Sequence, residues 1–133
     1  MTMLGNYSLD GKSGTRYRFA AYSRDSEFDA FAAVYVMVRQ DDLGHHLVYI
    51  GETADLSDRP LNCGCKDCFD HWGANAVWIY ALPNLRKRQE IKADLRSRYH
   101  PRCNAEPSGA LSAQAIAASF AMNEHRAVFL QTE

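Results

Sequence analysis

Six consecutive apolar residues that favour β-structure, Ala33-Val34-Tyr35-Val36-Met37-Val38, constrain the fold of this chain more than any other segment. A strand with one wet face alternates apolar and polar residues, whereas a run without alternation indicates a strand covered on both faces. The chain has 133 residues, of which 47% are hydrophobic, and this is the size of one compact domain. We therefore expect one domain built around a fully buried central strand.

Three further segments predict the neighbours of this strand. Residues 46–51 form the second arm of a hairpin, after a loop at 41–44 that is too long for a two-residue turn. Residues 76–82 supply another strand, and the alternation in residues 15–22 is typical of a half-buried edge strand. Residues 1–14 are rich in Gly, Ser and Asn and are expected to be a loose entry segment.

Two helices are expected in the second half of the chain. Residues 84–99 have helical spacing, with Asn84 as the N-cap and Pro101 as the stop. Residues 111–130 carry an apolar and Ala-rich stripe that suits packing. The expected fold is α/β, of the α+β type: a small antiparallel three-stranded sheet flanked by helices. Its parts are an N-terminal extension with an extra edge strand at 1–32, a core at 33–104 and a packed C-terminal helix at 105–133.

Charge and hydropathy limit the classes of function. With 15 Lys and Arg against 16 Asp and Glu, the net charge of -1 gives no chain-wide attraction to nucleic acid or to anionic lipid. The apolar stretches are far shorter than the roughly 20 residues that span a bilayer. We expect a soluble, cytoplasmic protein without a membrane partner, in which any site for a polyanion is a local patch.

Residues 86–102 form such a patch, because seven basic residues there are balanced by only Glu90 and Asp94. Basic side chains that contact phosphates give binding that depends on salt and little on sequence. A solvated helix face explains the same charges equally well. If nucleic acid binds, the residues expected to face its phosphates are Arg86, Arg88, Arg96 and Arg98.

The four cysteines do not have the pattern of a secreted disulfide framework, because three of them lie within six positions and Cys103 is distant. Cys63, Cys65, Cys68 and His71 are residue types that tetrahedral Zn²⁺ uses as ligands. Structural zinc sites usually draw two short pairs from separated segments, however, and here all four donors crowd one loop. Reduced thiols are therefore the favoured interpretation and zinc the alternative.

Four blocks occur in order along the chain, and together they resemble the GIY-YIG nuclease domain. They are Ala33-Val34-Tyr35, Tyr49-Ile50-Gly51-Glu52-Thr53, Asp55-Leu56-Ser57-Asp58-Arg59, and a last block with Leu95, Tyr99, Pro101 and Asn104. The resemblance covers residues 33–104. It implies a three-stranded antiparallel sheet flanked by helices, and hydrolysis of DNA phosphodiesters with one divalent metal, Mg²⁺ in an active member.

The resemblance also implies a role for individual residues. Tyr35 acts as, or with, the general base for the attacking water, and Tyr49 positions that water. Arg59 stabilises the charge that develops on the phosphoryl oxygens, a task that suits its planar, permanently charged guanidinium. Asn104 closes the site as a polar support, and Gly51 lets the backbone pass where a Cβ would intrude.

One departure from the family pattern concerns the metal. The family places a metal-binding glutamate three residues before the leucine that matches Leu95, and that position here is Lys92. An ammonium group has no lone pair and repels a cation, so Mg²⁺ binding is expected to suffer. Glu52 follows the second strand's glycine and also lines the expected site; it is a candidate replacement ligand, but a glutamate is unremarkable at that position in the family.

Three functions follow from these observations. The first is a GIY-YIG-like nuclease-fold protein that acts on DNA phosphodiesters with weakened or lost catalysis. The alternative is a non-catalytic module that binds nucleic acid, DNA or RNA, on the same scaffold. A third is a protein-interaction module whose partner is bound by the C-terminal helix at residues 111–130.

Overall fold

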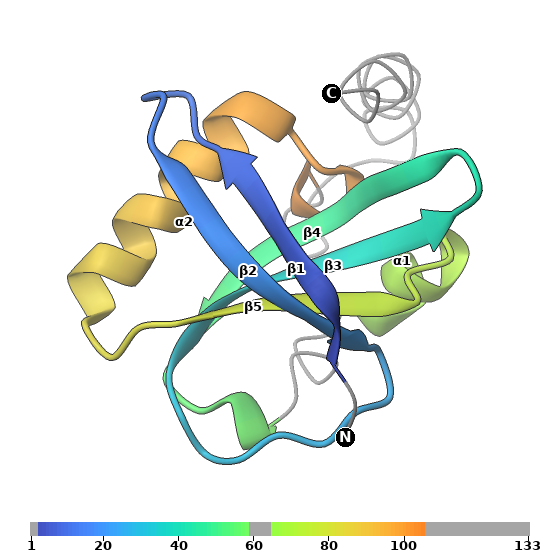
Figure 1. Cartoon of the computed structure of the whole chain (residues 1–133), viewed down its shortest axis with the longest axis horizontal. Helices are drawn as coiled ribbons and strands as arrows, with labels where there is room; N and C mark the ends of the chain where they lie inside the picture. Colours follow the sequence, from blue (N-terminus) through green and yellow to red (C-terminus); the bar gives the residue numbers. More distant parts are fainter. Residues whose placement is uncertain (1–2, 59–64, 106–133) are drawn as a thin grey trace.

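The computed structural model describes residues 3–58 and 65–105, which form one antiparallel sheet with two α-helices (Figure 1). The strand order is β1-β2-β5-β3-β4, so the sheet has five strands and not the expected three. The expected helix at 111–130 and Arg59 lie outside the described residues. The strands are β1 (Met3–Asp10), β2 (Arg16–Ser23), β3 (Ala33–Asp41), β4 (Gly44–Thr53) and β5 (Ala76–Ala81). The helices are α1 (Lys66–His71) and α2 (Leu85–Tyr99), with short 3₁₀ turns η1 (Leu56–Asp58) and η3 (Arg102–Ala105).

The central strand predicted from the apolar run is confirmed. β3 pairs with β4 along one edge and with β5 along the other. Each side chain from Ala33 to Val38 is 4% exposed or less. Pairing on both edges satisfies the backbone polar groups of β3, which therefore tolerates burial on both faces.

The N-terminal region differs from the expectation. β1 occupies residues that were expected to be loose, and β2 lies between β1 and β5, so β2 is not an edge strand. Polar residues mask the alternation in β1, in which Tyr7 and Leu9 face inward whereas Met3 and Leu4 are about half exposed. Tyr7 stacks on Trp78 of β5 with 4.6 Å between ring centroids, and Leu9 is buried.

The β3–β4 connection is also tighter than expected. Asp41 pairs with Gly44, so the loop contains only Asp42 and Leu43. The backbone N–H of Leu43 donates to Asp41 Oδ1 at 2.8 Å, and Gly44 has a φ of +129°, which a side chain would strain. The expectation of a longer loop was wrong because the polar ends of both strands continue the ladder beyond their apolar parts.

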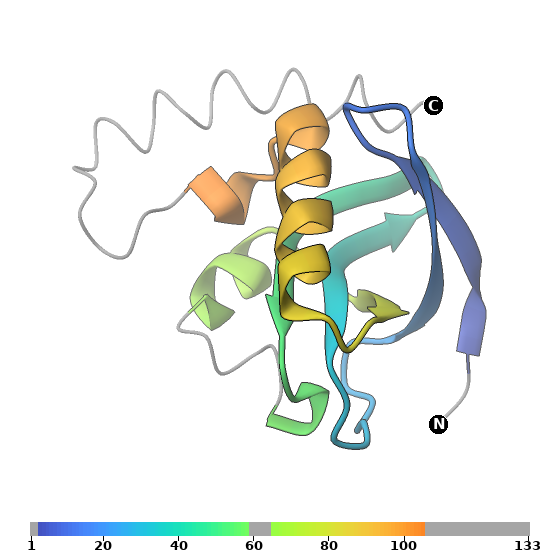
Figure 2. The same ribbon diagram turned by 90° about the vertical axis from the view of Figure 1, so that its left-hand side faces the viewer.

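The curled sheet separates two apolar cores. One core lies between the β1–β2 hairpin, the strands β3 to β5 and α2, and contains Phe19, Val34, Val36 and Leu95. The other lies on the opposite face of β3, beneath α1, and contains Tyr35 and several partners. Figure 2 shows α2 between the β1–β2 hairpin on one side and α1 with η3 on the other. Neither helix of the described part is long and apolar enough to cross a membrane.

Helix α2 begins and ends as the sequence predicted. Asn84 is its N-cap and accepts a hydrogen bond from the backbone N–H of Lys87 at 3.0 Å. His100, in the left-handed region with a φ of +48°, ends the helix just before Pro101. Two polar attachments of this helix, at Arg88 and Asp94, were not predicted from the sequence.

A buried ion pair fixes the first half of α2 to β4. Arg88 is only 3% exposed, and its Nε donates to Glu52 Oε1 at 2.8 Å. The same guanidinium donates to the carbonyls of Leu82 and Pro83 at 3.0 and 2.7 Å. These acceptors compensate for the desolvation of a buried charge. Arg88 therefore belongs to the interior and not to a phosphate-facing surface, which corrects the sequence prediction.

A second attachment joins the middle of α2 to the turn between β1 and β2. Asp94 accepts hydrogen bonds from the Ser13 backbone and hydroxyl and from the Tyr17 hydroxyl, at 2.7 to 2.8 Å. Burial by itself raises the pKa of Asp94, but the hydrogen bonds from Ser13 and Tyr17 outweigh it and hold that pKa below its ordinary value. Gly11 packs against this carboxylate and leaves no space there for a Cβ.

We predict that Arg88→Met lowers the free energy of unfolding by about 3 kcal/mol, because Glu52 keeps a half-buried charge without its partner. The matched control is Arg86→Met, two residues earlier on the same helix. The Arg86 side chain is 89% exposed, and its loss should change stability by no more than about 0.5 kcal/mol. Urea denaturation of both variants measures the difference. Equal effects would contradict the role assigned to the buried pair.

Candidate functional site

The two tyrosines implied by the family resemblance lie side by side. Tyr35 on β3 and Tyr49 on β4 have ring centroids 5.9 Å apart and planes tilted by 37°. Gly51 pairs with Tyr35 across the strands. A Cβ at Gly51 would lie 2.7 Å from Tyr35 Cζ and Oη and from Tyr49 Cε2, so glycine is required for the rings to sit over the backbone. Tyr35 is 4% exposed, whereas Tyr49 is half-buried and is the member of the pair nearer to solvent.

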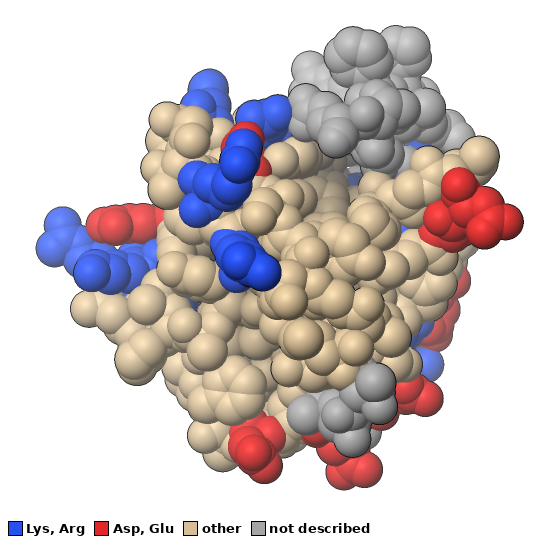
Figure 3. All heavy atoms as spheres, viewed as in Figure 1, with Lys and Arg blue, Asp and Glu red and all other residues tan. Residues whose placement is uncertain are grey.

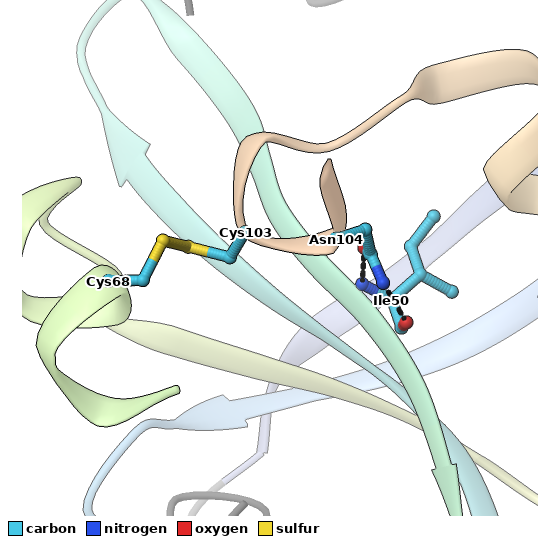
Figure 4. Close-up of a disulfide and its surroundings, with 4 residues drawn as sticks. All are labelled: Ile50, Cys68, Cys103 and Asn104. Carbon is cyan, nitrogen blue, oxygen red and sulfur yellow. Dashed lines mark hydrogen bonds between the residues drawn. A yellow bond between two sulfur atoms is a disulfide. The ribbon is translucent and has the colours of Figure 1, made fainter. Parts of the chain in front are cut away.

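Asn104 is attached next to the two tyrosines through Ile50, the residue of β4 between Tyr49 and Gly51 (Figure 4). The backbone N–H of Ile50 donates to Asn104 Oδ1 at 2.6 Å, and Asn104 Nδ2 donates to the Ile50 carbonyl at 2.8 Å. The carboxamide thus supplies the donor and acceptor that a neighbouring strand would supply at the outer edge of β4. It holds η3 next to Tyr49 and Gly51.

Helix α1 and a disulfide cover the tyrosine pair. Phe69 of α1 is fully buried and lies 5.3 Å from the Tyr49 ring, centroid to centroid. One residue earlier, Cys68 is bonded to Cys103 of η3, with 5.9 Å between the Cα atoms (Figure 4). The expectation of reduced thiols is therefore wrong for these two cysteines. They are 35 positions apart, and only the docking of η3 against β4 and α1 makes them neighbours.

The expected cysteine cluster is divided by this pairing. Cys68 in its bonded form has no thiolate to offer a zinc ion. Cys65 is the N-cap residue of α1, and His71 packs edge-on against Trp72 at the other end of the helix. Cys63 lies outside the described residues.

Helix α2, which carries Lys92, packs with its buried residues on the opposite face of the sheet from Tyr35. Helix α2 packs on the face formed by Val34 and Val36, whereas Tyr35 belongs to the opposite face. Lys92 is half-buried on the flank of α2 that also carries Arg96, one turn later. Arg96 Nη2 donates to the Asn104 carbonyl at 3.4 Å, so this flank approaches the outer edge of β4. The structure brings together Tyr35, Tyr49, Gly51 and Asn104.

The donor set at this site does not fit Mg²⁺. Lys92 stands where the resemblance requires a carboxylate, and the Glu52 carboxylate is directed to Arg88 at 2.8 Å. Among residues 3–58 and 65–105 there is no group of three or more His, Cys, Asp or Glu side chains that could hold a metal. The tyrosine pair and Asn104 therefore form a polar and aromatic site, and the described residues supply no cluster of carboxylates that could hold a metal there.

The exposed positive charge of the described chain gathers around α2. In Figure 3, Lys and Arg side chains cluster where Figure 1 places α2 and the β1–β2 turn, with a few acidic side chains among them, and other acidic side chains lie toward the opposite edge. Lys12 was missed from the sequence, and it joins this group because its backbone N–H donates to the Asp94 carbonyl at 3.2 Å. Arg98 is half-buried over the Tyr99 ring. The basic surface, as we call it, consists of Lys12, Arg86, Lys87, Arg96 and Arg98.

Comparisons of the chain with protein-family models, with curated proteins and with solved structures found no match. We therefore infer the function from the residues and their geometry.

We predict that Gly51→Ala destabilises the protein by about 1–3 kcal/mol, because the added methyl group collides with both tyrosine rings. Introduced into a Tyr49→Ala background, the same change should cost at least about 0.5 kcal/mol less, since one of the two obstructing rings is gone. Chemical denaturation of the four proteins of this double-mutant cycle measures the coupling. Additive effects would show that the Tyr49 ring does not pack against Gly51.

Proposed function

We propose that this chain is a GIY-YIG-like domain that binds the phosphate backbone of DNA through its basic surface and has lost efficient metal-dependent cleavage. The observation that carries the proposal is the exposure of Arg86, Lys87 and Arg96 on one helix, with Lys12 from the neighbouring turn. Each of these side chains can replace a counterion of the DNA.

The order of the elements supports the family part of the proposal. Within the larger sheet, β4, β3 and β5 are consecutive neighbours and antiparallel, with the tyrosine strand β3 in the middle. The β3–β4 hairpin is followed by α1, then β5, then α2. Strands β1 and β2 extend this unit beyond β5. Gly51 beneath two tyrosine rings is the local feature that the four sequence blocks imply.

The two acidic residues of α2 neutralise little of the positive charge of the basic surface. Asp94 is one of two acidic residues on α2, and its carboxylate is directed to Ser13 and Tyr17. Within the described part of the chain, Glu90 pairs with Arg86, at 3.4 Å on an exposed face where such pairs are weak. The positive charge of the helix is therefore largely available to an external anion.

The loss of cleavage is attributed to Lys92 and to the burial of Tyr35. A hydrolytic site of this class needs a carboxylate to hold the cation, and this chain supplies Lys92 in that position. The ammonium group can attract a phosphate but cannot polarise the scissile bond as a divalent cation would. Burial of Tyr35 further limits its access to an attacking water. Binding and cleavage are thus separable properties in this chain.

We expect the chain to bind short DNA duplexes of unrelated sequence with similar affinity, and binding to weaken steeply as salt rises. Replacing Arg86 and Lys87 by Ala should weaken binding several-fold and flatten the log–log salt slope by roughly one to two units. The matched control is Arg39→Ala with Lys66→Ala, which removes the same charge from residues paired with Asp41 and Asp70. Fluorescence anisotropy across a salt series gives both quantities.

The outcomes separate the three candidate functions. Equal weakening by both double variants would reduce the effect to net charge and overturn the basic surface as a site. Tighter binding to RNA than to DNA would correct the substrate. The absence of binding to duplex or single strands at low salt would leave the protein-interaction function, whose expected helix lies outside the described residues.

We also expect the natural chain to leave supercoiled plasmid intact with Mg²⁺ or Mn²⁺, because Lys92 opposes cation binding. Gel electrophoresis of the plasmid after incubation with the natural chain, Lys92→Glu and Tyr35→Phe measures nicking. Cleavage by the natural chain that Tyr35→Phe abolishes would contradict the loss of catalysis. Nicking gained only in Lys92→Glu would identify Lys92 as the cause of the loss.

A further inference from the structure

The turn between β1 and β2 is attached to α2 through one residue, Asp94. The backbone N–H of Lys12 donates to the Asp94 carbonyl at 3.2 Å. Ser13 donates to the Asp94 carboxylate from its backbone N–H at 2.8 Å and from its hydroxyl at 2.7 Å, and Tyr17 of β2 donates to the same carboxylate at 2.7 Å. Figure 2 shows the turn beside this helix. We call these contacts of Lys12, Ser13 and Tyr17 with Asp94 the Asp94 clamp.

The tip of the turn is exposed at residues 12–15, and hydrogen bonds within the turn join Gly11 to Thr15 and to Gly14. An exposed turn gains little stability from burial of side chains, so its position relative to α2 depends on the Asp94 clamp. The clamp holds the backbone of Lys12 in place and leaves its side chain exposed. A cation that is positioned in advance loses less conformational entropy when it binds a partner.

Cations of both elements lie around this attachment. On α2, Lys87 and Arg98 lie seven residues before and four residues after Asp94, a spacing that places the three side chains on one flank of the helix. On the hairpin, a hydrogen bond from Arg16 holds the pKa of Asp10 below its ordinary value, and the nearby charge of Arg98 lowers it further. Arg16 of β2 and Arg98 of α2 therefore lie near the same carboxylate, and the cations of the hairpin adjoin those of the helix.

We propose that the β1–β2 turn contacts DNA phosphates together with α2, and that Asp94 is the positioning residue that holds Lys12 in this surface. The inference rests on the DNA binding proposed above and assigns a second element to the same surface. Asp94 has two opposite effects on such a complex. Its negative charge repels phosphates, whereas its hydrogen bonds fix a turn that carries a phosphate contact.

Strands β1 and β2 acquire a role under this proposal. They extend the sheet beyond β5, and their turn returns to α2, the helix that follows β5 in the chain. Ser13 and Asp94 are 81 positions apart, so the surface is assembled from distant segments. The two additional strands then serve to bring a cation to the helix that binds DNA.

Two substitutions at Asp94 separate its charge from its hydrogen bonds, because both remove the charge. Asp94→Asn keeps a side chain that can accept and donate hydrogen bonds at the turn, whereas Asp94→Ala does not. We expect Asp94→Asn to bind a labelled DNA duplex more tightly than the natural chain does. Asp94→Ala should bind about threefold or more weakly than Asp94→Asn, with a log–log salt slope flatter by roughly one unit, the value for one lost phosphate contact. Fluorescence anisotropy over a salt series, at a temperature where each variant is folded, measures both quantities.

Lys12→Ala shows whether the clamp acts through the lysine. In the Asp94→Asn background, this change should weaken binding about threefold or more and flatten the slope by roughly one unit. In the Asp94→Ala background it should weaken binding by less than about 1.5-fold, because the contact is already lost. Lys87→Ala, on α2 itself, is the control and should weaken binding equally in both backgrounds. A purely structural role of Asp94 would not make the effect of Lys12→Ala depend on residue 94.

Gly11→Ala tests the clamp without any change of charge. A Cβ at Gly11 would collide with the Asp94 carboxylate, which must then move away from Ser13. We expect this variant to flatten the salt slope of the natural chain by roughly one unit. Asn75→Ala is the control for general loosening of the fold, because Asn75 makes two hydrogen bonds to the Gln40 backbone, at 2.8 and 2.9 Å, and should leave the slope unchanged.

The outcomes keep this inference apart from the function on which it rests. If the natural chain fails to bind duplex DNA at low salt, the proposed function and this inference both fall. If the natural chain binds and Asp94→Ala equals Asp94→Asn in affinity and slope, α2 binds DNA without the turn, and only this inference is overturned. Equal effects of Lys12→Ala in the two backgrounds would also overturn it. A flatter slope in Asp94→Ala and Gly11→Ala, beside an unchanged slope in Asn75→Ala, supports it.

Discussion

Pairing of β3 along both of its edges is the constraint on which the rest of the structure depends. Once β4 and β5 occupy those edges, the alternation of side chains along β3 assigns each residue to one of two cores. Val34 and Val36 face α2, and Tyr35 and Met37 face α1. A shift of register by one residue would exchange these two sets, so the same pairing that builds the core also places Tyr35 opposite Gly51.

Polar side chains attach the peripheral elements to this sheet. Asn104 holds η3 to β4, Asn75 holds the chain before β5 to the end of β3, and Asp94 holds α2 to the β1–β2 turn. Each side chain bonds to backbone groups that would otherwise face solvent or an empty edge. The Arg88–Glu52 pair uses a buried charge for the same purpose. These attachments set the position of α2 relative to the tyrosine strands.

The two faces of the sheet divide the chemistry of the protein. The face beneath α1 carries the tyrosine pair, the disulfide and Asn104, whereas α2 on the other face carries the exposed cations. Arg96 connects them, because it lies on α2 and donates to the Asn104 carbonyl. Apart from this contact, an anion bound on α2 would lie on the opposite face of the sheet from the tyrosine pair, which agrees with a proposed function in which binding is kept and cleavage is lost.

The sequence by itself determined the features that depend on neighbouring residues. The unbroken apolar run required a central strand, and Asn84 and Pro101 set the limits of α2, because strand burial and helix caps are read from local spacing. The sequence did not determine contacts between distant segments. The Cys68–Cys103 bond, the burial of Arg88 and the inclusion of β1 in the sheet were decided only by the tertiary structure. A cysteine or an arginine carries no local sign of its partner, and a polar strand such as β1 becomes a strand only when a neighbour accepts its hydrogen bonds.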